Sequence, residues 1–398
     1  MIRVGCATIA LASALLGSTA LAQDASVWRP AWTAAAAPAR FDGTPNAPLG
    51  YLDQTIRQAI RVGVAAKAVR LRVSNELGQE PLNLRDMTAA GPDGRVLPVA
   101  FGGAREIVIP AGVALVSDPL AIDLKRSDLL TVNLHAPGPT RGVVRRTAVR
   151  LGQGDTAVSS DAPLERRQSF ISAVYALTDA PPAVVVALGD SITEGATSTL
   201  GADADWPSVL DRRLEAACPG AFVVVNAGIS GNQVVRDGRS PNVRARLDRD
   251  VLSLPGVTHV LLIEGINDIR HDGNPDHPGR SADEVIASYR QIISRLHLRG
   301  VKVIGGTLTA FGGSERFDER SETARQTINA FIRDSGEFDG VADFDLATRN
   351  PAQPDALRLE FGRDDRLHPN DAGYEAMAHA VDLSLFTTEA SACGRALP

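Results

Sequence analysis

The chain has 398 residues, of which 44% are hydrophobic and 22% are charged, and its formal net charge is −6 at pH 7. These proportions are ordinary for a globular protein and leave room for two domains or one large one. The mildly acidic balance, without a basic stripe, argues against nucleic acid as a partner.

Residues 1–22 have the pattern of a secretory signal peptide. Arg3 precedes a short apolar core, and Ala20-Leu21-Ala22 forms a small-residue cleavage site. The segment is too short, and too rich in Ala, Gly and Ser, for a good membrane span. We therefore expect cleavage after Ala22, a secreted or periplasmic protein, and no stable membrane insertion of the cleaved chain.

Two cysteines, Cys218 and Cys393, follow this segment. In an oxidising compartment they could form a disulfide or remain two free thiols, because connectivity does not follow from sequence alone.

Residues 23–180 are expected to form a smaller, β-rich N-terminal domain. Alternating or β-rich segments lie at 55–62, 69–77, 105–112, 120–124, 129–138 and 170–177, and Gly, Pro, Asn and Asp separate them. This spacing is typical of a β-sandwich. The Pro-containing stretch 178–183 then reads as a linker.

Residues 181–398 change period. Apolar runs at 183–188, 221–228, 259–265, 301–309 and 341–345 alternate with helical patterns, which predicts an α/β domain with a parallel sheet covered on both faces. The clearest helix follows Ser281, with Glu284 completing a capping box and Gly300 ending it. In such sheets, sites form beyond the carboxyl ends of the strands.

Polar clusters follow these predicted strands at 189–191, 226–232 and 264–269, and another lies at 364–374 before the last helix. Ser191 is the candidate nucleophile and His368 the candidate base. Asp365 lies three residues before His368, so that on one turn its carboxylate can accept from one ring nitrogen and leave the other for the serine proton. Asn370 is suited to cap the last helix.

Three groups are candidate donors to an oxyanion: the backbone N–H groups of Ser191 and Gly231 and the side-chain amide of Asn267. We expect glycine at 231 because it permits close approach of the backbone. The candidates for a substrate-binding lining are Trp206, Phe311, Phe317 and the 272–280 loop, although each could instead be packing or surface.

Other functions have weaker support. His271 and His277, with Asp272 and Asp276, could ligate a metal, but no recognised zinc spacing is present, so no metal or cofactor is predicted. A non-catalytic carbohydrate-binding protein would fit if a base or an oxyanion donor were missing, and none is missing.

Taken together, the clusters resemble the SGNH/GDSL hydrolase superfamily across about residues 183–385. Ser191, Gly231 and Asn267 match its first three blocks, and Asp365-x-x-His368-Pro matches the last. Ile192 follows the serine at the position where the Gly-Asp-Ser-Leu motif that names the family has leucine, and this difference leaves the chemistry untouched. The β-rich part, with "QTIRQAIRVGV" and "VRLRVSNELGQEPL", looks like the extra domain of a secreted subgroup of acylhydrolases, some of whose relatives act on plant polysaccharides.

The resemblance implies a flavodoxin-like three-layer α/β/α domain and a serine esterase that works through a Ser-His-Asp triad and an acyl-enzyme without a cofactor. We expect a small-molecule or polysaccharide ester as substrate, and the low aromatic content, 5%, favours short acyl groups such as acetyl. A lipase or an acyltransferase of the same fold remains an alternative.

Overall fold

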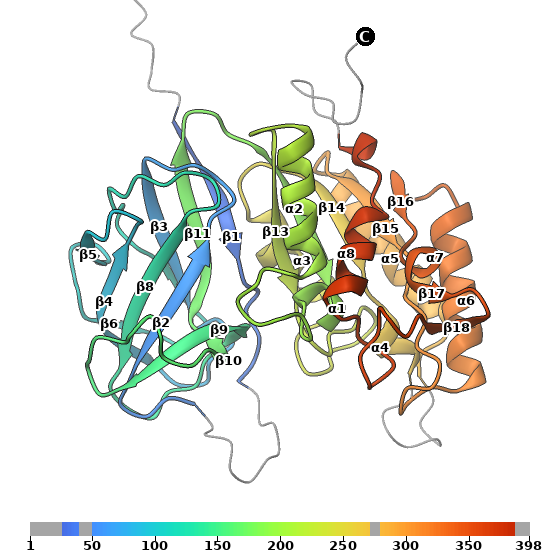
Figure 1. Ribbon diagram of the computed structural model, residues 1–398, viewed down its shortest axis with the longest axis horizontal. Coiled ribbons are helices and arrows are strands. Elements are labelled where there is room, and N and C mark those ends of the chain that lie inside the picture. Colours follow the sequence, from blue (N-terminus) through green and yellow to red (C-terminus); the bar gives the residue numbers. More distant parts are fainter. Residues whose placement is uncertain (1–25, 40–49, 271–278, 387–398) are drawn as a thin grey trace, which may run out of the picture.

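The computed structural model describes residues 26–39, 50–270 and 279–386. Two parts lie side by side along the long axis of the molecule (Figure 1), an antiparallel β-rich part that ends with Thr178 and a part with helices and a parallel sheet that begins at Ala183. One continuous cluster of buried apolar side chains includes residues of both parts. Cys218 is disulfide-bonded, whereas Cys393 lies outside the described residues, so the pairing of these two stays a prediction.

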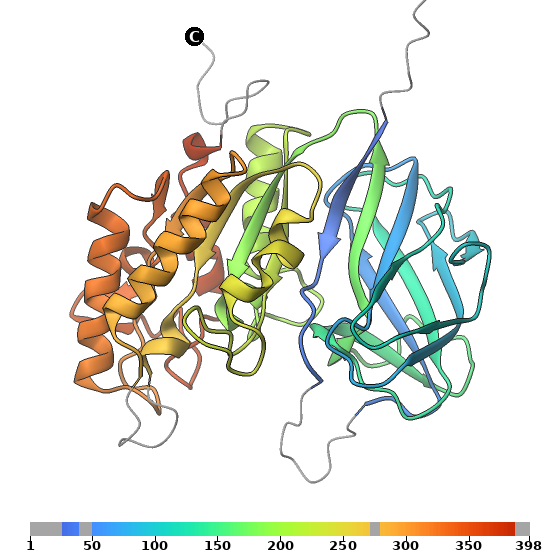
Figure 2. The same cartoon turned by 180° about the vertical axis from the view of Figure 1, so that it is seen from behind.

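The first part is built from two antiparallel sheets that face each other (Figures 1 and 2). One sheet has the order β1–β11–β3–β7, with bounds β1 Val27–Thr33, β3 Ala68–Ser74, β7 Ala114–Val116 and β11 Ile171–Thr178. The other has the order β10–β9–β2–β8–β4–β5, with β6 beside β4. Its bounds are β2 Gln54–Arg61, β4 Leu82–Ala90, β5 Val96–Pro98, β6 Ile107–Ile109, β8 Leu129–Ala136, β9 Val144–Gln153 and β10 Glu165–Ser169.

The alternation of buried and exposed side chains explains the strands that were predicted from the sequence. In β2, Ile56 and Ile60 are buried while Arg61 is exposed, as expected for a strand with one face on the core. The predicted strand at 120–124 is wrong, because Leu120 and Leu124 form only isolated bridges, to Val69 and Ala66 of the same chain.

The second part contains a five-stranded parallel sheet in the order β13–β12–β14–β15–β16. Its bounds are β12 Ala183–Gly189, β13 Phe222–Gly228, β14 Val257–Ile263, β15 Lys302–Gly306 and β16 Gly340–Ala342. The order, with the first strand second from one edge, is that of flavodoxin-like folds. From Val184 onward β12 is buried along its whole length, which is why its sequence is continuously apolar rather than alternating.

Helices cover both faces of this sheet. Helices α2 (Trp206–Ala217) and α8 (Asp371–His379) lie on one face, and α3 (Val243–Leu247) and α5 (Ala282–His297) lie on the other (Figures 1 and 2). The remaining elements are α1 Ser191–Glu194, α4 Ile266–Ile269, α6 Glu319–Asp334, α7 Phe344–Thr348, a π-helical turn Asp248–Leu252, a 3-10 turn Leu383–Leu385 and the hairpin β17 Arg349–Asn350 with β18 Gln353–Leu357.

The predicted fold class, a three-layer α/β/α domain preceded by a β-rich part, is therefore confirmed. The capping box at the start of α5 is present as expected, with Ser281 and Glu284 bonding each other's backbone N–H groups. Within the described ranges, none of the helices combines the length and the apolar character needed to cross a bilayer.

The sheet register sets the position of the site. Gly189, the last residue of β12, lies opposite Gly228 of β13 and Ile263 of β14. The segments that follow these strands therefore emerge at the same edge, beside the point where the strand order reverses. Ligand sites of open α/β sheets form at this position.

Candidate active site

Ser191 begins the short helix α1 directly after β12. Asp190 is its N-cap, and the Asp190 carboxylate accepts the backbone N–H of Ile192 at 2.9 Å. Gly189 is required before this turn, because a Cβ there would collide with the Ile263 carbonyl oxygen and the Thr193 hydroxyl. The result is a tight strand-to-helix turn that presents the serine side chain at the edge of the sheet.

The turn before α8 brings an aspartate and a histidine together. Asp365 Oδ1 accepts the backbone N–H groups of Leu367 and His368, each at 3.0 Å, and Oδ2 lies 2.6 Å from His368 Nδ1. Asn370 caps α8 as predicted, by accepting from the Gly373 N–H at 3.0 Å. The turn therefore fixes the orientation of the imidazole ring from one side.

The other ring nitrogen faces the serine: Ser191 Oγ and His368 Nε2 are 2.8 Å apart. Because the Asp365 carboxylate accepts from Nδ1, Nε2 is left to accept the hydroxyl proton of the serine. The three candidate residues thus form one hydrogen-bonded series, with the geometry of a nucleophile, a base and an orienting acid.

The Asp365 carboxyl is held in its ionised form. Partial burial disfavours its charge, but the hydrogen bonds from the His368 ring and from the backbone N–H groups of His368 and Leu367 outweigh burial and hold the pKa of Asp365 well below its ordinary value. An anion beside Nδ1 favours the imidazolium that forms when His368 takes a proton.

Two of the predicted oxyanion donors are unengaged. The backbone N–H groups of Ser191 and Gly231 donate to no acceptor within the part of the chain that the structure describes. Gly231 has φ +75°, and a Cβ at this position would meet only the side chain of Arg239 at 3.0 Å. The left-handed conformation favours glycine at this position. Close approach of the backbone to a bound oxyanion, the reason we expected for glycine, stays a prediction.

The third donor, Asn267, lies on α4 after β14, close to the nucleophile turn. Its Nδ2 donates to the Asn232 carbonyl at 3.0 Å and to the Asp190 carboxylate at 3.4 Å. Both hydrogens of the amide are therefore directed at protein acceptors. The longer of the two contacts is the one that an incoming oxyanion could replace at least cost.

Sequence reasoning missed a group of buried carboxylates beneath the site, Asp190, Glu264 and Asp268. Asp268 accepts the backbone N–H groups of Val234 and Val235, each at 2.9 Å, and so holds the loop that follows Gly231. Burial raises the pKa of Asp190 and of Asp268 to about 6, and it raises the pKa of Glu264 well above its ordinary value. The sequence signal for Asp268 is its place next to Asn267.

Arg246 was also missed. This fully buried arginine of α3 donates to the Gly189 carbonyl at 2.9 Å, the Ala227 carbonyl at 2.7 Å and Asn232 Oδ1 at 2.8 Å. It therefore joins the ends of β12 and β13 to the loop between Gly231 and α3. No local signal marks it, because its sequence context resembles an exposed helix with alternating arginines.

Two of the aromatic residues proposed to line the site, Trp206 and Phe311, are in the core, so the prediction is wrong for them. Trp206 has no exposed surface and packs against Phe344 with ring centroids 5.5 Å apart. Phe311 also has no exposed surface and packs edge to face against Phe317 at 5.3 Å. A fully buried ring cannot contact a substrate at the surface.

The proposed metal-binding histidines, His271 and His277, lie outside the described residues, as does most of the 272–280 loop. Elsewhere, in the described ranges, Asp86, His135 and Asp155 of the β-rich part are close enough together to hold an ion, but the two carboxylates are exposed, and His135 Nε2 lies 2.9 Å from Asp53. We predict no metal or cofactor for the chemistry at Ser191.

The sequence of this part of the chain matches a known family of enzymes. Residues 187–376 match the model of the GDSL-like lipase/acylhydrolase family. The matched segment contains Ser191, Gly231, Asn267, Asp365 and His368. This domain of the chain belongs to that family, and the protein is an ester hydrolase.

Two solved structures illustrate the similarity. An acetylxylan esterase from Geobacillus stearothermophilus is 25% identical, with 50% of this chain and 92% of that chain covered and a TM-score of 0.38. A GDSL-like lipase from Bacteroides thetaiotaomicron is 20% identical, with 50% and 84% covered and a TM-score of 0.37. No curated protein matches the chain.

Proposed function

We propose that the protein is a serine esterase in which Ser191 is the nucleophile, His368 the general base and Asp365 the residue that orients the base. The observation that carries this proposal is the series of two hydrogen bonds, 2.8 Å from Ser191 to His368 and 2.6 Å from His368 to Asp365. A serine hydroxyl is a weak nucleophile unless such a base removes its proton.

The reaction follows from these positions. Ser191 Oγ attacks the ester carbonyl carbon while its proton passes to His368 Nε2, and the carbonyl oxygen becomes an oxyanion. When the tetrahedral intermediate collapses, the ester C–O bond breaks, and Nε2 returns the proton to the departing alcohol. Water then attacks the acyl-enzyme by the same route, with His368 taking a proton from the water and giving it back to Ser191 Oγ.

The oxyanion is stabilised by the N–H groups of Ser191 and Gly231 and by the Asn267 amide, which exchanges its 3.4 Å contact with Asp190 for the substrate oxygen. Donors that are fixed before the reaction stabilise the developing charge without reorganisation, and one such donor contributes roughly 3–4 kcal/mol.

We further propose that the substrates are short acyl esters, acetyl esters of carbohydrates among them, and that the protein works outside the cytoplasm. The support for secretion is the signal-peptide pattern of residues 1–22, which lie outside the described residues. The support for short acyl groups is the low aromatic content, 5%, of the chain. A panel of esters of increasing acyl length, with acetylated xylan included, tests the preference.

The test of the catalytic proposal is hydrolysis of p-nitrophenyl acetate by the variant Ser191→Ala. We expect turnover to be abolished while the circular dichroism spectrum and melting temperature stay those of the wild type. Ser335→Ala, which removes an exposed hydroxyl after α6, is the matched control and should retain full activity. Retained turnover in Ser191→Ala would overturn the proposal. Product analysis with an alcohol present distinguishes hydrolysis from acyl transfer.

A further inference from the structure

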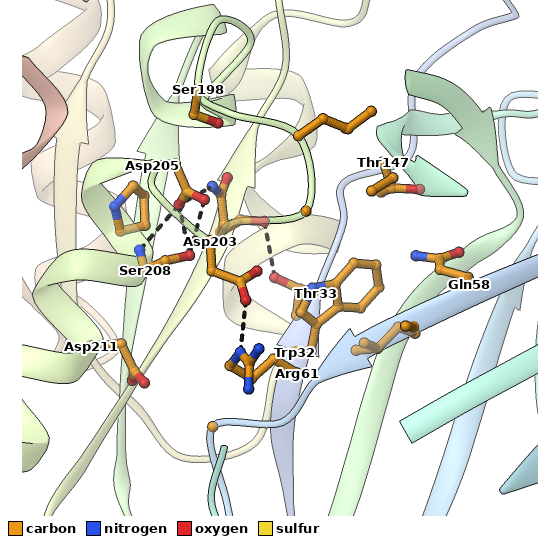
Figure 3. A pocket seen from close by; sticks show the side chains of 18 of the residues that line it. Trp32, Thr33, Gln58, Arg61, Thr147, Ser198, Asp203, Asp205, Ser208 and Asp211 are labelled. Carbon is orange, nitrogen blue, oxygen red and sulfur yellow. Dashed lines mark hydrogen bonds and ion pairs between the residues drawn. The ribbon is translucent and has the colours of Figure 1, made fainter. Parts of the chain in front are cut away.

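The β9–β10 hairpin of the β-rich part contacts the segment that follows the serine turn. Arg166 on β10 donates from Nη2 to the Ser198 carbonyl at 2.8 Å and from Nη1 to the Gly195 carbonyl at 3.4 Å. Figure 3 shows Ser198 at a cavity of about 320 Å³ between the two parts, with Thr147 of β9 on the far side. Arg166 therefore binds the segment 195–199 across the interface between the two parts.

The segment 195–199 is attached to the nucleophile turn at its beginning. The backbone N–H groups of Gly195 and Ala196 donate to the Ser191 carbonyl at 3.1 and 3.0 Å. The Ser198 hydroxyl closes the segment on itself through the Gly195 carbonyl at 2.8 Å. A displacement of this segment therefore acts directly on the backbone of Ser191.

The same segment is attached to the histidine turn at its end. Thr197 Oγ1 donates to the Pro369 carbonyl at 2.8 Å, and the Thr199 N–H donates to the Asp371 carboxylate at 2.8 Å. Pro369 follows His368 directly. The segment thus bridges the two residues whose separation determines proton transfer, and Arg166 holds the bridge from outside the α/β part.

A second arginine of the hairpin reaches toward the oxyanion donors. Arg146 Nε on β9 lies 3.8 Å from Glu194 Oε1, and the Glu194 side chain is 1% exposed. The other carboxylate oxygen of Glu194 accepts the backbone N–H of Ser230. Ser230 precedes Gly231, so Glu194 joins the side chain of Arg146 to the loop that carries the Gly231 N–H.

We propose that Arg166 and Arg146 are positioning residues of the active site: through segment 195–199 and Glu194 they set the separation of Ser191 and His368 and the direction of the Gly231 N–H. The inference rests on the proposed function of these groups. The β-rich part is then a structural component of the catalytic centre and not a separate module. Neither arginine touches the reacting atoms. Removing Arg166 should therefore lower kcat more than it changes KM, because a misplacement of about 1 Å can cost roughly 100-fold in rate.

The experiment compares Arg166→Met, Arg166→Lys and Arg167→Met in the full chain with p-nitrophenyl acetate. Arg167 is the matched control, because it is the next residue on β10 and bonds within the β-rich part, to the Gly50 carbonyl at 2.9 Å and to Glu165 at 3.1 Å. We expect Arg166→Met to lower kcat roughly 10- to 100-fold with KM little changed. Arg166→Lys should recover part of the loss, and Arg167→Met should keep the wild-type kcat.

An unchanged kcat in Arg166→Met, or an equal loss of kcat in Arg167→Met, would overturn the inference. A change confined to KM would also overturn it, because that result indicates a substrate-binding module. Melting temperatures establish that the variants are folded. If Arg166→Met does not fold, kcat is measured for Arg146→Met instead. An unchanged kcat in Arg146→Met contradicts the inference. An active Ser191→Ala would remove the proposed function itself, whereas an inactive Ser191→Ala with a fully active Arg166→Met removes only this inference.

Discussion

Ser191 Oγ lies 2.8 Å from His368 Nε2, although 177 positions separate the two residues in the chain. The contact joins the carboxyl end of the second strand in the sheet to the turn before the last helix. Because α1 and α8 are both packed on the sheet, the rigid part of the fold holds the two groups at hydrogen-bond distance before any substrate arrives.

Removal of the base, His368, should lower kcat more than removal of Asp365, which orients it. We expect Asp365→Asn to lower kcat by about four orders of magnitude and His368→Ala to lower it further. The double variant should be no slower than His368→Ala alone, because residues that act as a unit are not additive. Steady-state kinetics with a chromogenic acetyl ester measure these effects.

The control for this series is His297→Ala. His297 Nε2 lies 2.8 Å from Asp339 in another His–Asp pair, on the exposed end of α5. Loss of activity in this variant comparable to that of His368→Ala would contradict the assignment.

The activity should fall as the pH is lowered. His368 accepts a proton only when its ring is neutral, so kcat/KM should decline as the imidazolium forms. Asp365 adds no second step, because its hydrogen bonds hold its pKa well below the ordinary value despite partial burial. A rate that stays constant into acid solution would contradict the role of His368.

Asn267→Ala tests the oxyanion donors. We expect kcat to fall roughly 100- to 1000-fold with KM little changed, because the amide contributes mainly in the transition state. Asn350→Ala, in the hairpin β17–β18, removes an amide of the same size and should leave kcat unchanged. An increase in KM alone, with kcat unchanged, would place Asn267 in substrate binding instead.

Glu264→Gln should change how stability depends on pH. Burial raises the pKa of Glu264 well above its ordinary value of 4.5, and its Oε2 has no hydrogen-bond partner in the described part of the chain. The folded state therefore binds the proton more tightly than the unfolded state. Its contribution to stability is fully present below about pH 4.5 and is lost as the pH rises through the folded-state pKa.

The glutamine side chain does not ionise. The melting temperature of Glu264→Gln relative to that of the wild type should therefore increase as the pH rises above about 4.5. Melting curves over a pH series measure the difference, and the exposed Glu375→Gln provides the control. Parallel curves for wild type and Glu264→Gln would contradict the explanation.

Local signals were sufficient for the parallel sheet, for α5 and for the identity of the candidate site. Continuous apolar runs such as β12 are typical of strands buried on both faces, and the Ser281–Glu284 capping box is complete within four residues. Once parallel strands are predicted, their carboxyl ends must share an edge, which is why Ser191 and Asn267 could be expected to meet.

Features that depend on distant contacts could not be predicted. The sequence could not distinguish a substrate lining from core packing for Trp206 and Phe311. Their burial involves packing against Phe344 and Phe317, which are distant or not adjacent in the chain. The strands β9 and β10 were missed for a related reason. The cavity between the two parts is lined by Arg145, Arg146, Arg150 and Arg166 of these strands, so their sequence is as polar as that of a surface loop.

The most direct measurement is the site of covalent labelling by a fluorophosphonate. The account predicts that the hydroxyl of Ser191 displaces fluoride, that mass spectrometry of the digested protein places the adduct on Ser191, and that His368→Ala is not labelled at a measurable rate. An adduct on a different residue in an enzyme inactivated by the reagent, or equally fast labelling of Ser191 without His368, would contradict it.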